Sequence, residues 1–204
     1  MLRCRSGSGP VDARAGWRVP AAWDETVFMA STTSLTRLDH PATDSRLLRD
    51  AFSCFPSGVV ALCSLIDGVP VGMVASTFAC VSLAPALVSV CIQRASNTWA
   101  RLKHASSIGV SCLSAAQGEA CRQLAAKSGD RFAGLDWAAT EAGAILLDGA
   151  TALFDCRVHS EIPAGDHEII LLEIAAIRMH PELEPLVFHG STFRAFEARG
   201  SAAA

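Results

Sequence analysis

Several patterns that would assign a chemistry at once are missing from this chain of 204 residues. It contains no tyrosine, so no phenol hydroxyl is available for a hydrogen bond. It has neither a GxGxxG turn after a strand nor a GxxxxGK[ST] loop, which excludes the two usual phosphate-cradling motifs. The GxSxG and HExxH motifs of hydrolases and zinc proteases are missing too. If the protein binds a dinucleotide, it must therefore use a different fold.

Cysteines at metal-binding or redox spacing are also missing. No two of the eight cysteines form a CxxC or CxxxC pair, so we expect neither a zinc site nor a redox dithiol, and we predict no metal site. Most of them lie inside apolar runs, which is typical of small buried thiols in a reducing cytoplasm. The eight are Cys4, Cys54, Cys63, Cys80, Cys91, Cys112, Cys121 and Cys156.

The chain has little net charge and no long apolar run. Its formal net charge is -3 and it has no block of five basic residues, which argues against nucleic acid or an anionic membrane as a partner. No apolar run is long enough to span a bilayer. Arg3 and Arg5 are not followed by the apolar segment of a secretory signal. We therefore expect a cytoplasmic protein.

The composition favours one folded domain after an N-terminal extension. Half of the residues are apolar and 18% are charged, which allows a sizeable core. Residues 1–44 are rich in Gly, Pro, Ser and Thr and show no regular period, so we expect them to be disordered. Met29 precedes a polar stretch typical of a bacterial N-terminus, so either translation starts there or the extension is real. Residues 45–198 are the predicted domain, and residues 199–204 are a predicted flexible tail.

The pattern after Asp44 predicts a mostly β domain with small flanking helices. Asp44 is a plausible N-cap for a helix that Pro56 ends, and further helices are expected at about 97–104 and 115–126. Strands are predicted at 59–66, 69–78, 86–92, 107–113, 151–162, 167–180, 186–189 and 192–196, and a loop at 127–143. Asp67-Gly68 is a hairpin turn signal. Many short strands with few helices favour a closed barrel over a doubly wound sheet.

Four polar stretches are candidates for a binding site. In Gly72–Phe78, small residues would let a flat ligand approach the backbone, and two hydroxyls could donate hydrogen bonds; the alternative is an ordinary strand end. Gln93–Trp99 opens a helix, which suits a phosphate, although simple helix capping explains it too. Lys127–Phe132 is either a ligand loop or a solvated loop. Gly165–His167 forms a hairpin turn whose histidine is either catalytic or merely exposed.

In this order, the stretches resemble the flavin reductase-like, FMN-binding split-barrel family, the reductase components of two-component flavin monooxygenases. The resemblance covers about residues 46–197. The matching segments are LLRDAFSCFPSGVVALCS, DGVPVGMVASTFACVSLAPALVSVCI, SNTWARL, SGDRFAGLDW, LLDGATALFDCRV, AGDHEIILLEI and PLVFHGSTFRAF.

The resemblance implies a fold and a reaction. The fold would be a six-stranded split β-barrel that forms a homodimer, with flavin near the subunit interface. The cofactor would be FMN, or FAD, reduced by hydride transfer from NADH or NADPH. The reduced flavin would then leave for a partner flavin-dependent oxygenase.

The resemblance also implies a set of site residues. Those that would line the isoalloxazine ring are Val74, Ala75, Ser76 and Thr77, with Ser57 and Gly58 in a loop nearby. Those that would contact the ribityl chain and phosphate are Gln93, Ser96 and Thr98. The catalytic assignment is His167, beside the nicotinamide, and the C-terminal segment from His189 to Phe193 would close that site.

The chain departs from the family pattern at several of these places. Phe188 and Phe193 stand where the family often has tyrosine, Val74 and Ala75 replace more polar residues, and Ser191 replaces a glycine. Two other functions stay open at this point: a flavin- or haem-binding split-barrel protein without turnover, and a flavoprotein oxidase or oxygenase that retains its flavin.

Overall fold

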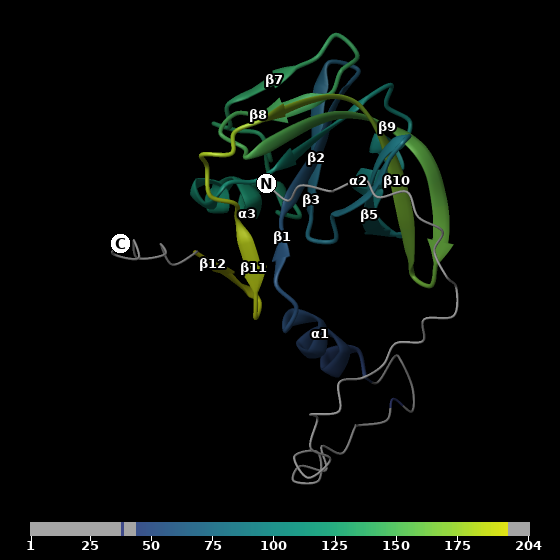
Figure 1. Cartoon of the computed structure of the whole chain (residues 1–204), viewed down its shortest axis with the longest axis vertical. Coiled ribbons are helices and arrows are strands. Elements are labelled where there is room, and N and C mark those ends of the chain that lie inside the picture. The colour runs from purple at the N-terminus through teal and green to yellow at the C-terminus, as the bar shows by residue number, and fades with distance from the viewer. Residues whose placement is uncertain (1–37, 39–43, 196–204) are drawn as a thin grey trace, which may run out of the picture. The chain divides into compact units, whose positions relative to one another are not determined.

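The computed structural model describes residue 38 and residues 44–195 (Figure 1). The alternative start at Met29 and the predicted tail at 199–204 lie outside the described residues. So does the predicted extension at 1–44, apart from residues 38 and 44. The helices are α1 (Ser45–Ser53), α2 (Asn97–Leu102) and α3 (Gly118–Leu124), with a 3-10 turn η2 (Ala115–Gln117) before α3. None of the described helices combines the length and the hydropathy that crossing a bilayer requires.

One antiparallel sheet of seven strands dominates the described part of the chain. Its strands are β2 (Val60–Ile66), β3 (Val69–Ala75), β4 (Ala79–Leu83), β5 (Ala86–Gln93), β6 (Ile108–Cys112), β9 (Ala152–Ala164) and β10 (His167–Met179). Their spatial order is β3-β2-β6-β9-β10-β5-β4. The edge strands β3 and β4 follow each other in the chain but are not hydrogen-bonded to each other, so the sheet is split at this point (Figure 1).

This topology confirms the predicted mostly β split barrel, with differences in detail. The sheet is open where a closed barrel was expected, and it has seven strands rather than six. The additional strand is β4, which the sequence did not mark because it is short and ends two residues before Pro85; it pairs with β5, which begins directly after that proline. β3 ends at Ala75 rather than at Phe78.

Two smaller sheets complete the described structure. β1 (Ser57–Gly58), β11 (Val187–His189) and β12 (Thr192–Arg194) form one, and β7 (Trp137–Ala139) pairs with β8 (Ile145–Leu147) in the other. β7 lies in the segment 127–143 that was predicted to be a loop; pairing with β8 decides its conformation, and a three-residue strand has no period to detect.

The hairpin turns follow their local sequence signals. Asp67 and Gly68 both have positive φ, 52° and 76°, as a two-residue turn between right-twisted strands requires. The long hairpin of β9 and β10 turns at Gly165-Asp166, where His167 begins β10. That turn therefore places His167 at the end of the sheet.

β2 forms the centre of the core. Val60 and Leu62 pack into one buried cluster, and Ala61 and Cys63 pack into the other, because successive side chains of a strand point to opposite faces. Both clusters cover β2, so its five N-terminal residues are all buried, and this explains why Ser64 is the one polar residue in its sequence.

The cysteines of the described residues are free thiols. Cys63, Cys121 and Cys156 are buried, as expected, whereas Cys54 and Cys80 are exposed. Burial raises the pKa of both Cys63 and Cys156 to about 12, so these thiols stay protonated and unreactive in the folded chain.

Candidate functional site

The end of β3, the end of β5 and the start of β10 lie next to one another. His167 is directly opposite Gln93 in the β5–β10 pair. On the other side of β5, Thr77 is hydrogen-bonded to Cys91, two residues before Gln93. The fold thus brings Thr77, at the end of the predicted segment Val74 to Thr77, beside the strand that carries Gln93, and it places Gln93 opposite His167.

Thr77 and Ser76 differ in what their hydroxyls can do. Thr77 Oγ1 accepts a hydrogen bond from Cys91 N at 2.8 Å and donates one to Cys91 O at 3.1 Å. It therefore takes the place of a backbone pair between the chain after β3 and β5. Ser76 is exposed, and its hydroxyl forms no hydrogen bond within the part of the chain that the structure describes. Of the two, Ser76 offers the free donor.

Helix α2 begins beside β3, and its two predicted contact residues both have partners. Ser96 Oγ accepts a hydrogen bond from Trp99 N at 3.2 Å, which is ordinary helix capping, and lies 4.0 Å from Met73 Sδ. Thr98 Oγ1 accepts a hydrogen bond from Arg131 Nη1 at 3.1 Å. Because that oxygen is already an acceptor for an arginine, its own proton is free to donate to a ligand.

His167 is held by its neighbour in the turn. Its Nδ1 lies 2.8 Å from Asp166 Oδ1, and this hydrogen bond lowers the pKa of the Asp166 carboxyl. An ionised carboxylate only accepts hydrogen bonds, so Nδ1 carries the proton. In the neutral ring, Nε2 is then left as an acceptor. The side chain is 37% exposed, which leaves it accessible to a ligand.

The other predicted residues lie in the three-stranded sheet. Ser57 and Gly58 pair with Phe188 and Val187. Gly58 remains close to the end of β3, because the next strand pairs Val60 with Ala75. β1 therefore connects this small sheet to the residues around Ser76.

His189 and Phe193 take part in that sheet mainly through packing. The rings of Phe188 and Phe193 have centroids 5.8 Å apart, and the Arg122 guanidinium lies 5.1 Å from the Phe193 centroid. His189 and Arg194 line a small cavity with Pro56 and Val187. Within one chain, Phe193 is thus packed against α3; that it closes a nicotinamide site stays a prediction.

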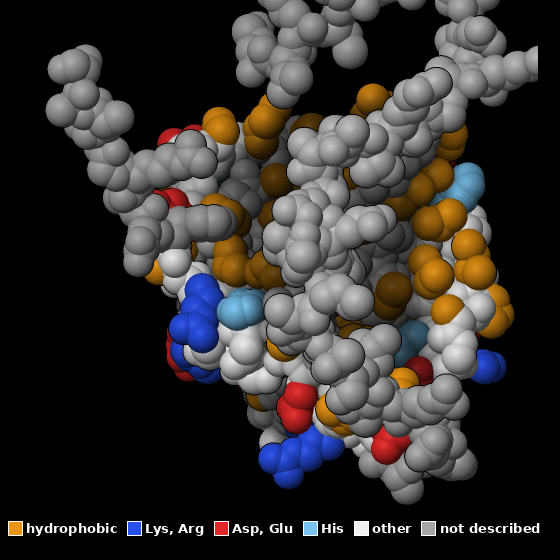
Figure 2. All heavy atoms as spheres, turned by 60° about the horizontal axis from the view of Figure 1, so that its bottom comes forward, with side chains coloured by type: hydrophobic (Ala, Val, Ile, Leu, Met, Phe, Trp, Pro, Cys, Tyr) orange, Lys and Arg blue, Asp and Glu red, His pale blue; other side chains and the backbone are white. Residues whose placement is uncertain are grey.

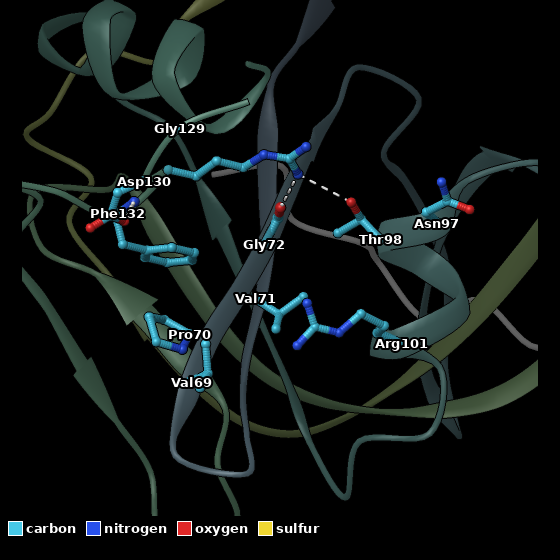
Figure 3. A pocket seen from close by; sticks show the side chains of 11 residues that line it. Val69, Pro70, Val71, Gly72, Asn97, Thr98, Arg101, Gly129, Asp130 and Phe132 are labelled. Carbon is cyan, nitrogen blue, oxygen red and sulfur yellow. Dashed lines mark hydrogen bonds between the residues drawn. The ribbon is translucent and has the colours of Figure 1, made fainter. Parts of the chain in front are cut away.

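A cavity of about 370 Å³ lies beside Thr98. Its walls are the start of β3, helix α2 and the loop before β7 (Figure 3). Arg131 Nη1 connects these walls, since it donates to both Gly72 O and Thr98 Oγ1 at 3.1 Å. The sequence marked this loop only as charged with one aromatic residue, and did not single out Arg101 or Arg131 as site residues.

Gly72 has a different role from the one its sequence suggested. A Cβ at this position would lie 2.6 Å from Cys63 Sγ and 2.7 Å from the ring of Phe132. The missing side chain therefore makes room for Phe132, which is buried against the core, rather than for a flat ligand.

Comparison with known proteins gives one family and several close relatives. The family described as "Flavin reductase like domain" matches residues 52–197. The actinorhodin polyketide dimerase of Streptomyces coelicolor is 38% identical over 156 residues, 76% of this chain and 88% of that protein. A flavin-dependent monooxygenase reductase subunit, HsaB of Rhodococcus jostii, is 31% identical over 156 residues, 76% of this chain and 80% of that protein.

A solved structure with the same fold is the NADH:FAD oxidoreductase SgcE6 of Streptomyces globisporus C-1027, in complex with NAD and FAD fragments. It is 35% identical to this chain, with a TM-score of 0.75, and the match covers 81% of this chain and 100% of that one.

Proposed function

Because the chain belongs to the flavin reductase-like domain family, we propose that it is an NAD(P)H:flavin oxidoreductase whose product, reduced flavin, serves a partner monooxygenase. Membership confirms the resemblance seen in the sequence. The observation that supports the proposal is the pairing of Gln93 with His167, while Thr77, the neighbour of Ser76, is hydrogen-bonded to Cys91 of the same strand β5. The named monooxygenase reductase subunit among the relatives supports the partner.

The free polar groups at this end fit a flavin. A flavin presents carbonyl oxygens on its ring and phosphate oxygens at the end of its ribityl chain, and both need donors. Ser76 has an unused hydroxyl, and Thr98 has a hydroxyl proton that Arg131 leaves free. Bound there, the flavin would supply the hydride acceptor, and the chain's own residues would supply the positioning.

His167 would orient the nicotinamide rather than supply a proton. Hydride transfer requires the donor carbon and the acceptor nitrogen to be held about 3–3.5 Å apart, and the donor carbon needs no acid from the protein. Asp166 fixes the ring of His167 so that Nε2 is an acceptor. That nitrogen can accept a hydrogen bond from the carboxamide N–H of a nicotinamide and so fix the orientation of its ring.

Within this reaction we assign NADH as the donor and both FAD and FMN as acceptors. Support comes from the solved relative, which is named an NADH:FAD oxidoreductase. FMN and FAD share the ring and the first phosphate, so Ser76 and Thr98 would serve both. The free thiols of the described residues support action in the reducing cytoplasm.

We further infer that the protein is a homodimer. Large apolar side chains are exposed on α1, directly after α1 and on β4: Phe52 is 71% exposed, Phe55 76% and Leu83 98%. Figure 2 shows hydrophobic side chains gathered in clusters on one face of the molecule. Exposed apolar clusters of this kind are typical of interfaces. Light scattering after size-exclusion chromatography should give twice the chain mass, and Leu83→Asp should shift the protein toward the monomer.

The experiment for the proposed function is a steady-state matrix of two flavins and two nicotinamide cofactors without oxygen. Catalytic bleaching of added FMN and FAD with NADH is expected, at flavin concentrations far above that of the protein. Stoichiometric bleaching that stops after one turnover would indicate a protein that retains its flavin. No bleaching, with flavin bound, would indicate a binding protein without turnover.

A further inference from the structure

We propose that a groove on β9 and β10, at the end of β10 away from His167, binds a small zwitterion, an α-amino acid with a short apolar side chain. The groove has a volume of about 190 Å³ and is lined by residues of these two strands and of the hairpin of β7 and β8. It is smaller than the roughly 300–1,000 Å³ typical of ligand and cofactor sites. A molecule of a few non-hydrogen atoms therefore suits it better than a flavin or a nicotinamide cofactor.

A β-bulge in β10 forms the polar part of this groove. The register between β9 and β10 shifts by one residue between Ile174 and Ala176, and after the shift Ala176 pairs with Asp155. Arg178, two residues further along β10, therefore lies on the same face of the sheet as Asp155. Without the bulge, Arg178 would be turned to the opposite face. A local irregularity of the backbone thus places two opposite charges on one side of the sheet.

The opposite charges of Asp155 and Arg178 do not pair with each other. Diagonal neighbours on antiparallel strands are roughly 7–8 Å apart, and Arg178 forms no hydrogen bond or ion pair within the described part of the chain. Ala176 is opposite Asp155 and two residues before Arg178, and its short side chain leaves the space between the two charges open. A ligand with one positive and one negative group fits this space.

Both charged groups are available to a ligand. The buried Ser107 donates a hydrogen bond to Asp155 Oδ1, which orients the carboxylate and leaves Oδ2 without a partner among the described residues. Arg178 is exposed, and a guanidinium can bind a carboxylate through two parallel hydrogen bonds. Thr140 Oγ1 accepts a hydrogen bond from Ala144 N at 3.1 Å, so the hydroxyl proton is free for a carboxylate as well.

The remaining lining of the groove is apolar. Leu153 is buried, Leu146 is half-buried, and Ile177 adds an exposed apolar surface. In this arrangement Asp155 binds the ammonium group, Arg178 binds the carboxylate, and the leucines contact a short side chain. A simple anion or a simple amine would leave one of the two charges unpaired, whereas a zwitterion satisfies both.

Amide NMR titrations with L-alanine, propionate and ethylamine test the proposal, because propionate lacks the ammonium group and ethylamine lacks the carboxylate. We expect L-alanine to bind in the millimolar range and to shift the amide signals of Asp155, Ala176 and Arg178. Each probe with a single charge should bind at least about tenfold more weakly, as the loss of one charge-assisted hydrogen bond predicts. His167 lies at the other end of β10, so the result does not depend on the proposed function.

Two variants with matched controls locate the site. Arg178→Gln should weaken L-alanine binding about tenfold, and Arg157→Gln, which removes an exposed arginine that does not line the groove, should leave it unchanged. Ala176→Val should block the groove, whereas Ala175→Val, beside it in the strand, should not. Absence of L-alanine binding, equal binding of propionate and L-alanine, shifts confined to other residues, or equal affinity in Arg178→Gln and the wild type would each overturn the proposal.

Discussion

At the residue scale, neighbouring hydroxyls of one segment serve different purposes. The Thr77 hydroxyl both donates to and accepts from the backbone of Cys91, whereas the Ser76 hydroxyl forms no hydrogen bond within the described residues. From residue type and position in the sequence alone, the same role would be predicted for both hydroxyls. The structure separates them because only Thr77 is bonded to Cys91, where the edge of β5 that β4 occupies up to Ser89 has no further strand partner.

This difference gives a matched pair of substitutions. Ser76→Ala should raise the Michaelis constant for flavin about tenfold with little change in kcat, because its hydroxyl would bind the flavin equally in the ground and transition states. Thr98→Ala should act in the same way. Thr77→Val should instead lower the stability by roughly 1–3 kcal/mol through the lost bonds to Cys91. Flavin titrations and urea unfolding measure the two effects, and unchanged flavin affinity in both Ser76→Ala and Thr98→Ala would reject these contacts.

His167 provides a second test at this scale. His167→Ala should lower kcat/KM for NADH by roughly 10–100 fold and leave flavin binding in the absence of nicotinamide nearly unchanged. Asp166→Asn should give a smaller loss in the same quantity, because an amide does not fix the proton on Nδ1 as a carboxylate does. Anaerobic stopped-flow reduction at varied NADH measures both variants. Equal rates of flavin reduction in the wild type and in His167→Ala at every NADH concentration would show that His167 is an ordinary turn residue.

At the scale of elements, β3 combines packing with positioning. Its Gly72 accommodates Phe132 on one side, and the Gly72 carbonyl accepts a hydrogen bond from Arg131. One arginine thereby fixes β3, α2 and the loop before β7 relative to one another. The position of Thr98 thus depends on residues far away in the sequence.

Filling the space at Gly72 should disturb this arrangement. Gly72→Ala places a methyl group 2.6 Å from Cys63 Sγ and 2.7 Å from the Phe132 ring, so Phe132 must move. We expect a loss of about 1–3 kcal/mol in the free energy of unfolding, as for other overpacked cores. Gly118→Ala, in helix α3, is the control, since its methyl group would lie at an ordinary 3.5 Å from the Phe193 ring. Urea unfolding measures the stability of both variants. If Gly72→Ala is as stable as Gly118→Ala and the wild type, the structure around Gly72 relaxes without cost.

At the scale of the whole molecule, the buried thiols link stability to alkaline pH. Burial raises the pKa of Cys63 and Cys156 from 9.0 to about 12, and the absence of tyrosine removes another group that would ionise in this range. The unfolded chain can release these protons above about pH 9, and the folded chain cannot. Their contribution is therefore fully present below pH 9.0 and is lost as the pH rises toward 12.

Each thiol should lower the free energy of unfolding by roughly 1.4 kcal/mol per pH unit in that window. Between about pH 8 and 11, the free energy of unfolding should thus decrease less steeply with pH for the double variant Cys63→Ala, Cys156→Ala than for the wild type. Replacement of the exposed Cys54 and Cys80 should leave the slope as it is. An identical slope in all variants would show that the buried thiols do not cause the decline.

The sequence predicted those features that neighbouring residues encode. The Asp67-Gly68 turn, the largely apolar β2 and the long hairpin that turns just before His167 are all local signals, because backbone preference and side-chain period depend on adjacent residues. The family motifs, in order along the chain, likewise gave the split barrel and the flavin chemistry. Short strands such as β4 and β7 were not predicted, because they contain too few residues to show a period and are formed only by pairing with their partner strands.

Only the tertiary structure decided which side chains meet. Arg131 reaches Gly72 and Thr98 across 59 and 33 residues of sequence, and Thr77 meets Cys91 across 14. It also separated the buried Cys63 from the exposed Cys80, although both follow apolar residues. Strand register and the return path of a loop fix such pairs, and no local sequence pattern records them. The local sequence therefore determined the elements and the class of reaction, whereas the register of the folded sheet determined the cavity beside Thr98 and the residues that line it.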